Sequence, residues 1–264
     1  MITSASNRKI KEAENLSKKA AVRKETGLFT VEGVRMFAEL PVKKIREVFV
    51  SETFYETCSS EVREKIGSVP NETVSDAVFS RISDTRTPQG IFAIAEQNSY
   101  TLEDILKNPS AAHILILETV QDPGNLGTMF RAGEGAGLTG IIMDCQTADL
   151  YNPKVIRSTM GSIFRVPFFR TEDLPGTIKT VKQAGIRVIA AHLNGSVSYT
   201  EEDYLSPTAF MIGNEAAGLK AETADLADTR VRIPMLGEVE SLNAAVAASV
   251  LMFELARQRR NHGM

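Results

Sequence analysis

The stretch "LETVQDPGNLGTMFRAGEGAGLTGIIM", residues 117–143, decides the fold of the larger part of this chain. It places six glycines between two apolar runs that have the composition of β-strands. A glycine-rich turn between a strand and a helix often holds a phosphate group. Neither the dinucleotide pattern G-x-G-x-x-G nor the Walker pattern G-x-x-x-x-G-K-[ST] fits its spacing, so the two common nucleotide loops are excluded.

Two polar residues of this stretch then need another explanation. Asn125 has the position of a helix N-cap, and Arg131 follows six residues later. Helical spacing puts Arg131 off the predicted buried face that contains Phe130, and Gly127 one turn earlier leaves that flank open. An arginine near the carboxyl edge of a parallel sheet suits an anionic ligand. A solvated surface arginine is the alternative that this stretch alone leaves open.

Strand and helix patterns alternate along the whole chain. Residues 1–97 predict a small α/β domain that starts with a basic helix. Residues 98–110 are polar and end in Asn-Pro-Ser, which is typical of a linker, with a possible short helix. Residues 111–264 predict a larger α/β domain. Its first apolar run, "AHILILETV", indicates a central parallel strand that is buried on both faces.

Composition and charge exclude several classes of protein. The net charge is −3, but the first 24 residues hold seven Lys or Arg against two Glu, which favours either a polyanionic partner or a solvated helix face. No run is long and apolar enough for a membrane span, and no secretory leader is recognised. With two cysteines and three dispersed histidines, we expect a cytoplasmic protein without disulfides, membrane association or metal.

The last predicted helix, "SLNAAVAASVLMFELARQRR" at residues 241–260, is apolar on nearly every face up to Phe253. Such a helix has to be covered on more than one side, and a single sheet covers only one. We expect a second subunit to cover the remaining face; another helix of the same chain is the alternative.

Two further loops join the opening stretch. "FMIGNEAAGL" (210–219) places Gly-Asn-Glu at a strand end, and "VRIPMLGEVESLNAAVA" (231–247) places Ile-Pro-Met at another strand end and Ser-Leu-Asn before the last helix. Each has a structural explanation by itself, a turn for the first and a helix cap at Ser241 for the second. Three such loops at strand ends of one sheet indicate a ligand site in the crevice beyond those ends.

In this order, the three stretches resemble the three motifs of SpoU-type (TrmH-like) RNA ribose methyltransferases of the SPOUT superfamily. "LFTVEGVRMFAEL" (28–40) resembles the start of the ribosomal-protein-like substrate-binding domain that is often fused to them. The resemblance implies an α/β fold whose C-terminal parallel-sheet domain contains a deep trefoil knot. It also implies a homodimer in which the last helix lies at the interface.

The resemblance further implies methyl transfer from S-adenosylmethionine to a ribose 2′-OH, with ribosomal RNA as the preferred target. Transfer RNA methylation and a non-catalytic RNA-binding or ribosome-assembly role remain alternatives. A nicotinamide-dependent oxidoreductase is weakened by the missing dinucleotide pattern.

Site residues follow from the same resemblance. The expected catalytic residues are Arg131, Asn125, Glu215 and Asn243, and the expected cofactor-binding residues are Gly213, Ile233, Leu242, Asn214, Met235 and Ser241. With a pKa above about 12, an arginine is no standing base, so Arg131 is expected to orient the hydroxyl and to stabilise a developing alkoxide. Glu215 is expected to orient the ligand loop, or alternatively to pair with Arg131. His192 is expected to be a structural residue at a strand end, with a role as base as the alternative. The candidate RNA contacts, or alternatively solvated surface residues, are Tyr151, Asn152, Lys154 and Arg157.

Overall fold

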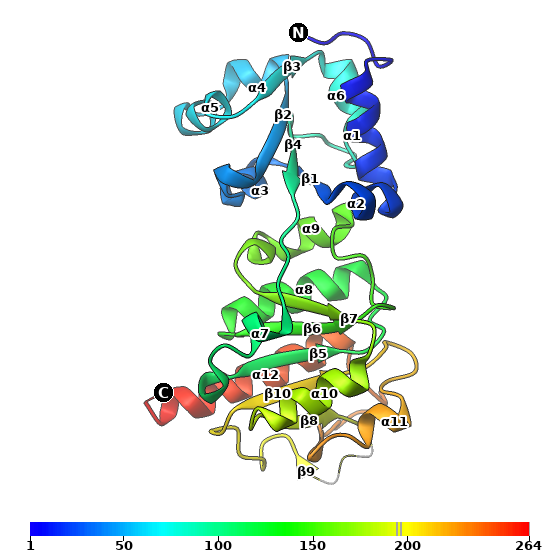
Figure 1. The fold of residues 1–264 in the computed structure, drawn as a ribbon, viewed down its shortest axis with the longest axis vertical. Helices are drawn as coiled ribbons and strands as arrows, with labels where there is room; N and C mark the ends of the chain where they lie inside the picture. Colours follow the sequence, from blue (N-terminus) through cyan, green and yellow to red (C-terminus); the bar gives the residue numbers. More distant parts are fainter. Residues whose placement is uncertain (194, 196, 264) are drawn as a thin grey trace. The chain divides into compact units, whose positions relative to one another are not determined.

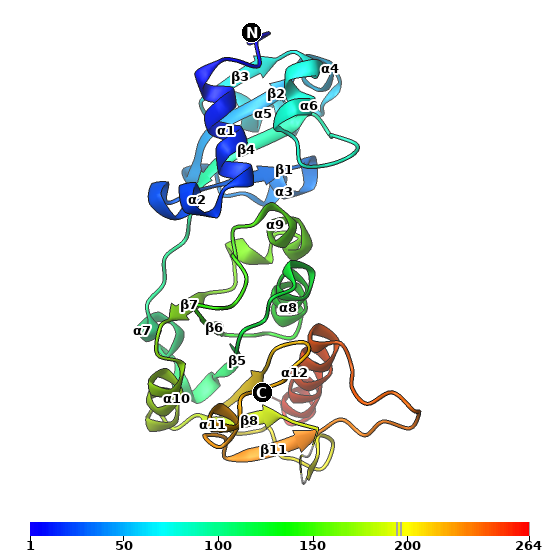
Figure 2. The same ribbon diagram turned by 90° about the vertical axis from the view of Figure 1, so that its right-hand side faces the viewer.

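A computed structural model describes residues 1–193, 195 and 197–263 of the chain. Contacts divide the chain into two compact units (Figures 1 and 2). The first consists of Met1–Asn98 together with Asp149–Phe164, and the second of Ser99–Ala148 together with Arg165–Met264.

The first unit is built on a four-stranded sheet in the order β1-β4-β2-β3. Its strands are β1 (Leu28–Glu32), β2 (Ile45–Ser51), β3 (Asn71–Val74) and β4 (Ile91–Glu96). The pairs β1/β4 and β4/β2 are antiparallel, and β2/β3 is parallel. Helices α1 (Arg8–Lys18) and α6 (Asp76–Ile82) pack beside each other on one face, where Ile10 and Phe79 join the buried residues of β2 and β4. The remaining elements are α2 (Ala20–Thr26), α3 (Val34–Glu39), η1 (Val42–Lys44), α4 (Glu52–Thr57) and α5 (Ser60–Gly67).

A segment from far along the chain completes this unit. Residues 149–164 contain α9 (Pro153–Thr159) and η3 (Ser162–Phe164), and α9 packs on β1. The buried guanidinium of Arg23 donates to the Asp149 carboxylate at 2.9 and 2.6 Å, and the Tyr151 ring lies 4.7 Å from that of Phe29. The division therefore differs from the one expected from the sequence, which assigned this segment to residues 111–264.

The predicted linker also differs. Residues 102–111 form α7 (Leu102–Ile105) and η2 (Pro109–Ala111), and they belong to the second unit. Ile105 is buried in the core of that unit and packs so closely on Gly140 that a Cβ there would lie 2.8 Å from Ile105. The stretch is thus packed rather than free, because its few apolar residues face the core.

The second unit contains a seven-stranded sheet in the order β7-β6-β5-β10-β8-β11-β9, and every pairing in it is parallel. The strands are β5 (His113–Leu117), β6 (Gly140–Asp144), β7 (Phe168–Thr171), β8 (Arg187–Ala191), β9 (Val197–Ser198), β10 (Thr208–Ile212) and β11 (Thr229–Arg232). All residues of β5, β6 and β10 are buried, which confirms the parallel sheet expected from the apolar run at residues 112–120. The trefoil knot stays a prediction.

Besides α7, the described part of this unit contains the helices α8 (Pro123–Gly135), α10 (Leu174–Gln183), α11 (Ala221–Ala224) and α12 (Ala244–Asn261). Helix α12 packs on α8 and on β10, and it buries Leu251, Met252 and Leu255. Another helix of the same chain therefore covers part of it. Val246 and Phe253 remain 48% and 50% exposed, so a second apolar strip of α12 stays uncovered within the chain.

Stability should depend on pH through His113, which is buried at the start of β5. Burial, aided by the charge of Arg259, lowers the pKa of the imidazole from 6.5 to about 4. Below about pH 6.5 this histidine binds a proton in the unfolded chain but not in the folded chain. The free energy of unfolding therefore falls as the pH drops towards 4. We expect the free energy of unfolding to be about 2 kcal/mol lower at pH 5 than at neutral pH on this account.

Urea unfolding of His113→Phe at both pH values tests this expectation. The substitution keeps a ring against Phe210, whose centroid lies 6.2 Å from that of His113, and it should remove most of the acid sensitivity. Replacing the exposed His262 with Phe is the control. An unchanged pH profile in His113→Phe would contradict the assignment.

Candidate cofactor pocket and its hydrogen-bond network

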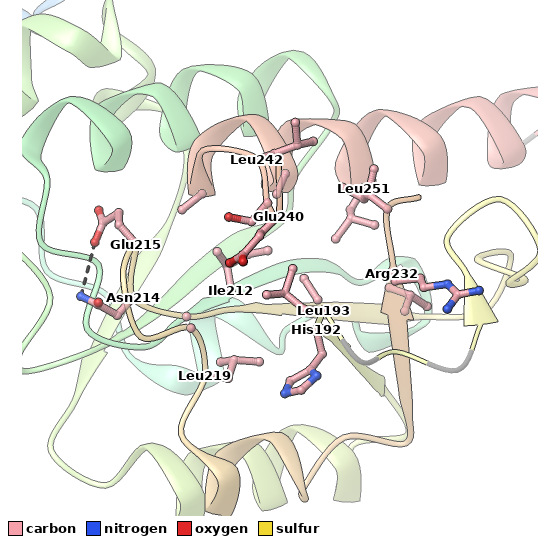
Figure 3. A pocket seen from close by; sticks show the side chains of 18 of the residues that line it. His192, Leu193, Ile212, Asn214, Glu215, Leu219, Arg232, Glu240, Leu242 and Leu251 are labelled. Carbon is pink, nitrogen blue, oxygen red and sulfur yellow. Dashed lines mark hydrogen bonds between the residues drawn. The ribbon is translucent and has the colours of Figure 1, made fainter. Parts of the chain in front are cut away.

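A cavity of about 600 Å³ lies at the carboxyl ends of β8, β10 and β11 (Figure 3). All three strands are parallel, so their ends meet at one edge of the sheet, where open α/β sheets bind ligands. The lining comes from residues 191–193, 212–219, 231–235 and 240–242, and from Ala244, Ala247 and Leu251 of α12. Two of the three loops singled out in the sequence therefore form its walls.

All six expected cofactor-binding residues line this cavity: Gly213, Asn214, Ile233, Met235, Ser241 and Leu242. Gly213 is required by packing, because a Cβ there would lie 2.1 Å from the carbonyl carbon of Gly218 and 2.2 Å from the nitrogen of Leu219. The closeness results from a turn in which Asn214 and Gly218 exchange two backbone hydrogen bonds of 3.0 and 2.9 Å. The side chain of Asn214 accepts from the backbone of Ala216 and Ala217 and so holds the turn.

The first loop is joined to this turn through Glu215. Its carboxylate accepts hydrogen bonds from the backbone nitrogens of Gln121 and Asp122 at 3.1 and 2.9 Å, and from Nδ2 of Asn125 at 3.0 Å. Burial raises the pKa of Glu215, but these hydrogen bonds outweigh it and hold the pKa below its usual range. The carboxylate thus stays charged and fixes the two loops together.

The network continues to the third loop. Oδ1 of Asn125 accepts a hydrogen bond of 2.9 Å from Nδ2 of Asn243. The Oδ1 of Asn243 in turn accepts from the backbone nitrogens of Ala245 and Val246 in the first turn of α12. Three of the four expected catalytic residues, Asn125, Glu215 and Asn243, therefore form one chain of hydrogen bonds across the three loops. Their side chains hold the loops in register, which agrees with the loop-orienting role expected for Glu215.

Two expected helix caps are different in the structure. Helix α8 begins at Pro123 and its N-cap is Asp122, whose carboxylate accepts from the nitrogen of Asn125 at 2.8 Å. Proline is favoured in the first helical turn, where its missing N–H costs nothing, so the cap moves to the residue before it. Helix α12 is capped by Asn243 rather than by Ser241.

Arg131 stands apart from this cavity. It is exposed on α8, and it is absent from the residues that line the cavity. Its guanidinium makes no hydrogen bond or ion pair with any residue that the structure describes. Gly127 is buried, so the open flank expected there is absent.

A pair of hydrogen bonds at the start of the first loop, from Thr119 to Asp144, was not predicted from the sequence. Thr119 has φ of 56°, an unusual backbone conformation for a β-branched residue. The buried carboxylate of Asp144, at the end of β6, accepts from the nitrogen and hydroxyl of Thr119 at 3.0 and 2.8 Å. The carbonyl oxygen of Thr119 in turn accepts a hydrogen bond of 2.9 Å from Nδ2 of Asn214. An aspartate ending the run "GIIMD" is the signal that could have indicated it.

Among residues 1–193, 195 and 197–263, no three His, Cys, Asp or Glu side chains gather in a way that could hold a metal ion. Over the same residues, no helix has the length and apolar character of a membrane span. His192 lines the cavity, and its backbone nitrogen donates to the carbonyl of Val231, which places it at the strand end as expected.

The fold and the cavity together define a class: a doubly wound α/β protein with a small-molecule site beyond its parallel strands, joined to a smaller α/β unit. Comparison with known proteins narrows this class. Residues 112–253 match the SpoU rRNA Methylase family, and residues 7–93 match the MRM3-like substrate binding domain. The chain belongs to the SpoU rRNA methylase family.

Relatives and solved structures agree along nearly the whole chain. It is 32% identical to the 23S rRNA (guanosine(2553)-2'-O)-methyltransferase RlmP of Bacillus subtilis, over 96% of this chain and 98% of that protein. The AdoMet-bound rRNA methyltransferase from Sinorhizobium meliloti is 35% identical, with a TM-score of 0.84 over 97% of both chains. The SpoU methyltransferase AviRb from Streptomyces viridochromogenes, in complex with AdoMet, is 27% identical with a TM-score of 0.86, over 96% of this chain and 98% of that one.

Proposed function

We propose that this protein transfers a methyl group from S-adenosylmethionine to a ribose 2′-hydroxyl of ribosomal RNA. The observation that carries the proposal is the convergence of the second and third motif loops around one cavity, with all six expected cofactor residues in its lining. Family membership and the name of the Bacillus subtilis relative favour ribosomal RNA over transfer RNA.

The residues present fit this cofactor. The cavity has the volume of a typical small-molecule site, and the side chains of Ile233 and Leu242 give it apolar walls suited to a nucleobase. Glu240 also borders it, and the charge of its carboxylate suits a positively charged sulfonium (Figure 3). When bound, the cofactor supplies an electrophilic methyl group.

The chain itself would align the hydroxyl and help it lose its proton. The chain of hydrogen bonds through Glu215, Asn125 and Asn243 keeps three loops in fixed positions, so the two reactants meet in a defined geometry. Arg131 presents a planar guanidinium, which can hold a phosphate by two parallel bonds and stabilise the charge that develops on the sugar oxygen.

Arg131 can do so only if it reaches a cavity, and it does not line that of its own chain. We therefore propose a homodimer in which each Arg131 serves the cavity of the partner. Residues Thr128, Arg131 and Gly135 form the exposed strip of α8, and it continues onto Phe253 of α12, whose Cζ would lie 3.6 Å from a Cβ at Gly135. A second copy would cover the apolar strip of α12 and bring the two strips of α8 together about a two-fold axis.

The activity is tested with S-adenosylmethionine labelled with tritium in its methyl group. We expect label to enter 23S rRNA transcribed in vitro, at a single position that then resists alkaline cleavage, because a 2′-O-methyl group removes the attacking hydroxyl. Label on a base, or none in any RNA, would contradict the proposed chemistry. Label entering only transfer RNA transcripts would replace ribosomal RNA with the alternative substrate.

The shared site is tested with differently tagged subunits. We expect a purified heterodimer of Arg131→Ala with Leu242→Arg to regain about half of the wild-type rate, because one of its two cavities has both an intact lining and a partner arginine. Homodimers of each variant should be inactive and serve as controls. An inactive heterodimer, or a monomeric wild-type protein in solution, would contradict a site shared between subunits.

A further inference from the structure

The basic start of the chain is less available to a polyanion than its composition indicates. Of the seven Lys and Arg among the first 24 residues, four are engaged within the unit. The pairs are Arg8 with Glu12, Lys9 with Glu47 and Glu72, Lys18 with Glu14, and the buried Arg23 with Asp149. Another part of the first unit therefore has to be considered as its surface for RNA.

The loop between α6 and β4, residues 83–90, is held in a defined shape at its start. The carboxylate of Glu32, buried at the end of β1, accepts hydrogen bonds from the hydroxyls of Ser83 and Thr85 and from the nitrogen of Asp84. Asp84 also forms an ion pair of 3.0 Å with Arg157 of α9. The first three residues of the loop are thus fixed from two sides.

The end of the loop is held as well. Oε1 of Gln89 accepts a hydrogen bond of 2.9 Å from the backbone nitrogen of Val34. This bond joins the loop to the start of α3. Gly33 and Gly90 have φ of 98° and 82°, and a Cβ at Gly90 would lie 2.3 Å from Cβ of Phe54. Both glycines are therefore required for the backbone to take this course.

Between these fixed ends the loop presents exposed polar residues. Arg86, Thr87, Pro88 and Gln89 are all exposed, and so is Arg35 in the adjoining first turn of α3. Neither Arg35 nor Arg86 has a hydrogen bond or ion pair to any residue in the described ranges. Because the backbone on which the two arginines stand is already restrained, binding a ligand has to order only their side chains, which lowers the entropic cost of holding it.

We propose that this edge, formed by residues 33–35 and 84–89 and here called the arginine edge, holds the backbone of the substrate RNA. Arginine is suited to phosphate because its planar fork makes two parallel hydrogen bonds, and it can stack on an unpaired base. RNA is commonly recognised through such unpaired nucleotides rather than through duplex base edges. The proposal rests on the proposed function, since it names the surface that brings RNA to the methyltransferase.

The test compares two double variants in binding to 23S rRNA transcribed in vitro. We expect Arg35→Ala/Arg86→Ala to weaken binding about tenfold or more at moderate salt, and to reduce the slope of log K against log salt by about 0.7 for each phosphate that is no longer neutralised. Lys11→Ala/Lys24→Ala removes two exposed cations of α1 and α2 that have no hydrogen bond or ion pair to the described residues, and we expect a clearly smaller loss. An equal or larger loss in the lysine variant would overturn the proposal.

Affinity for S-adenosylmethionine separates this proposal from the activity itself. Both double variants should bind the cofactor like the wild type and should methylate at the wild-type rate when RNA is saturating. A wild-type protein that transfers no methyl group would refute the proposed function. Wild-type transfer together with wild-type RNA affinity in Arg35→Ala/Arg86→Ala would refute the arginine edge alone.

Discussion

Arg131→Lys should lower the rate of methyl transfer by about 100-fold or more while leaving the dissociation constant for S-adenosylmethionine unchanged. The lysine keeps the positive charge but loses the planar fork, so it can hold a phosphate only as a point charge. Cofactor affinity should not change because the proposed contacts of Arg131 are with the phosphate and the sugar oxygen of the RNA rather than with the cofactor. Single-turnover transfer to saturating RNA, with calorimetry for cofactor binding, measures both quantities.

A neighbouring substitution provides the control for this experiment. Thr128 is exposed on the same strip of α8, and Thr128→Ala should retain cofactor binding and most of the activity. Light scattering should give the same mass for both variants, which excludes a loss of assembly as the cause. If Arg131→Lys turns over at the wild-type rate, the guanidinium has no special role in the reaction.

The parallel sheet could be predicted because its signal is local. Residues 113–117 form a continuous apolar run, and such a run is typical of a strand covered on both faces. The lining of the cavity could be predicted for a related reason, since loops that follow parallel strands have to meet at one edge of the sheet. Neither prediction depends on which residues far apart in the sequence are in contact.

Long-range pairings could not be predicted in the same way. Nothing near Asp149 in the sequence indicates that its partner is Arg23, 126 residues earlier, yet this pair joins α9 to the first unit. The hydrogen bond between Glu215 and Asn125 spans 90 residues and has no local signal in the sequence. The aspartate that ends "GIIMD" indicates a polar contact at that strand end, but it does not identify Thr119, with its φ of 56°, as the partner. In the proposed homodimer, the position of Arg131 relative to the partner's cavity would depend on how two subunits pack, and no local sequence pattern indicates that packing.

Gly213→Ala is expected to reduce affinity for S-adenosylmethionine by about 100-fold or more, and to lower the free energy of unfolding by about 1–3 kcal/mol. The added methyl group would meet the backbone at Gly218 and Leu219 at 2.1 and 2.2 Å, and backbone atoms cannot rotate away as a flexible side chain can. The turn has to open, which breaks the paired hydrogen bonds between Asn214 and Gly218. Opening also moves Glu215, so the first loop loses the carboxylate that holds Asn125.

Gly237 offers a matched glycine in the loop that follows Met235. A Cβ there meets nothing within 4 Å, so Gly237→Ala should bind the cofactor and unfold like the wild type. Calorimetric titration with S-adenosylmethionine and thermal unfolding of both variants separate a packing requirement at Gly213 from a general sensitivity of these loops. Wild-type cofactor affinity in Gly213→Ala would mean that the turn yields without disturbing the site, and the cavity beside it would then no longer be supported as the binding site.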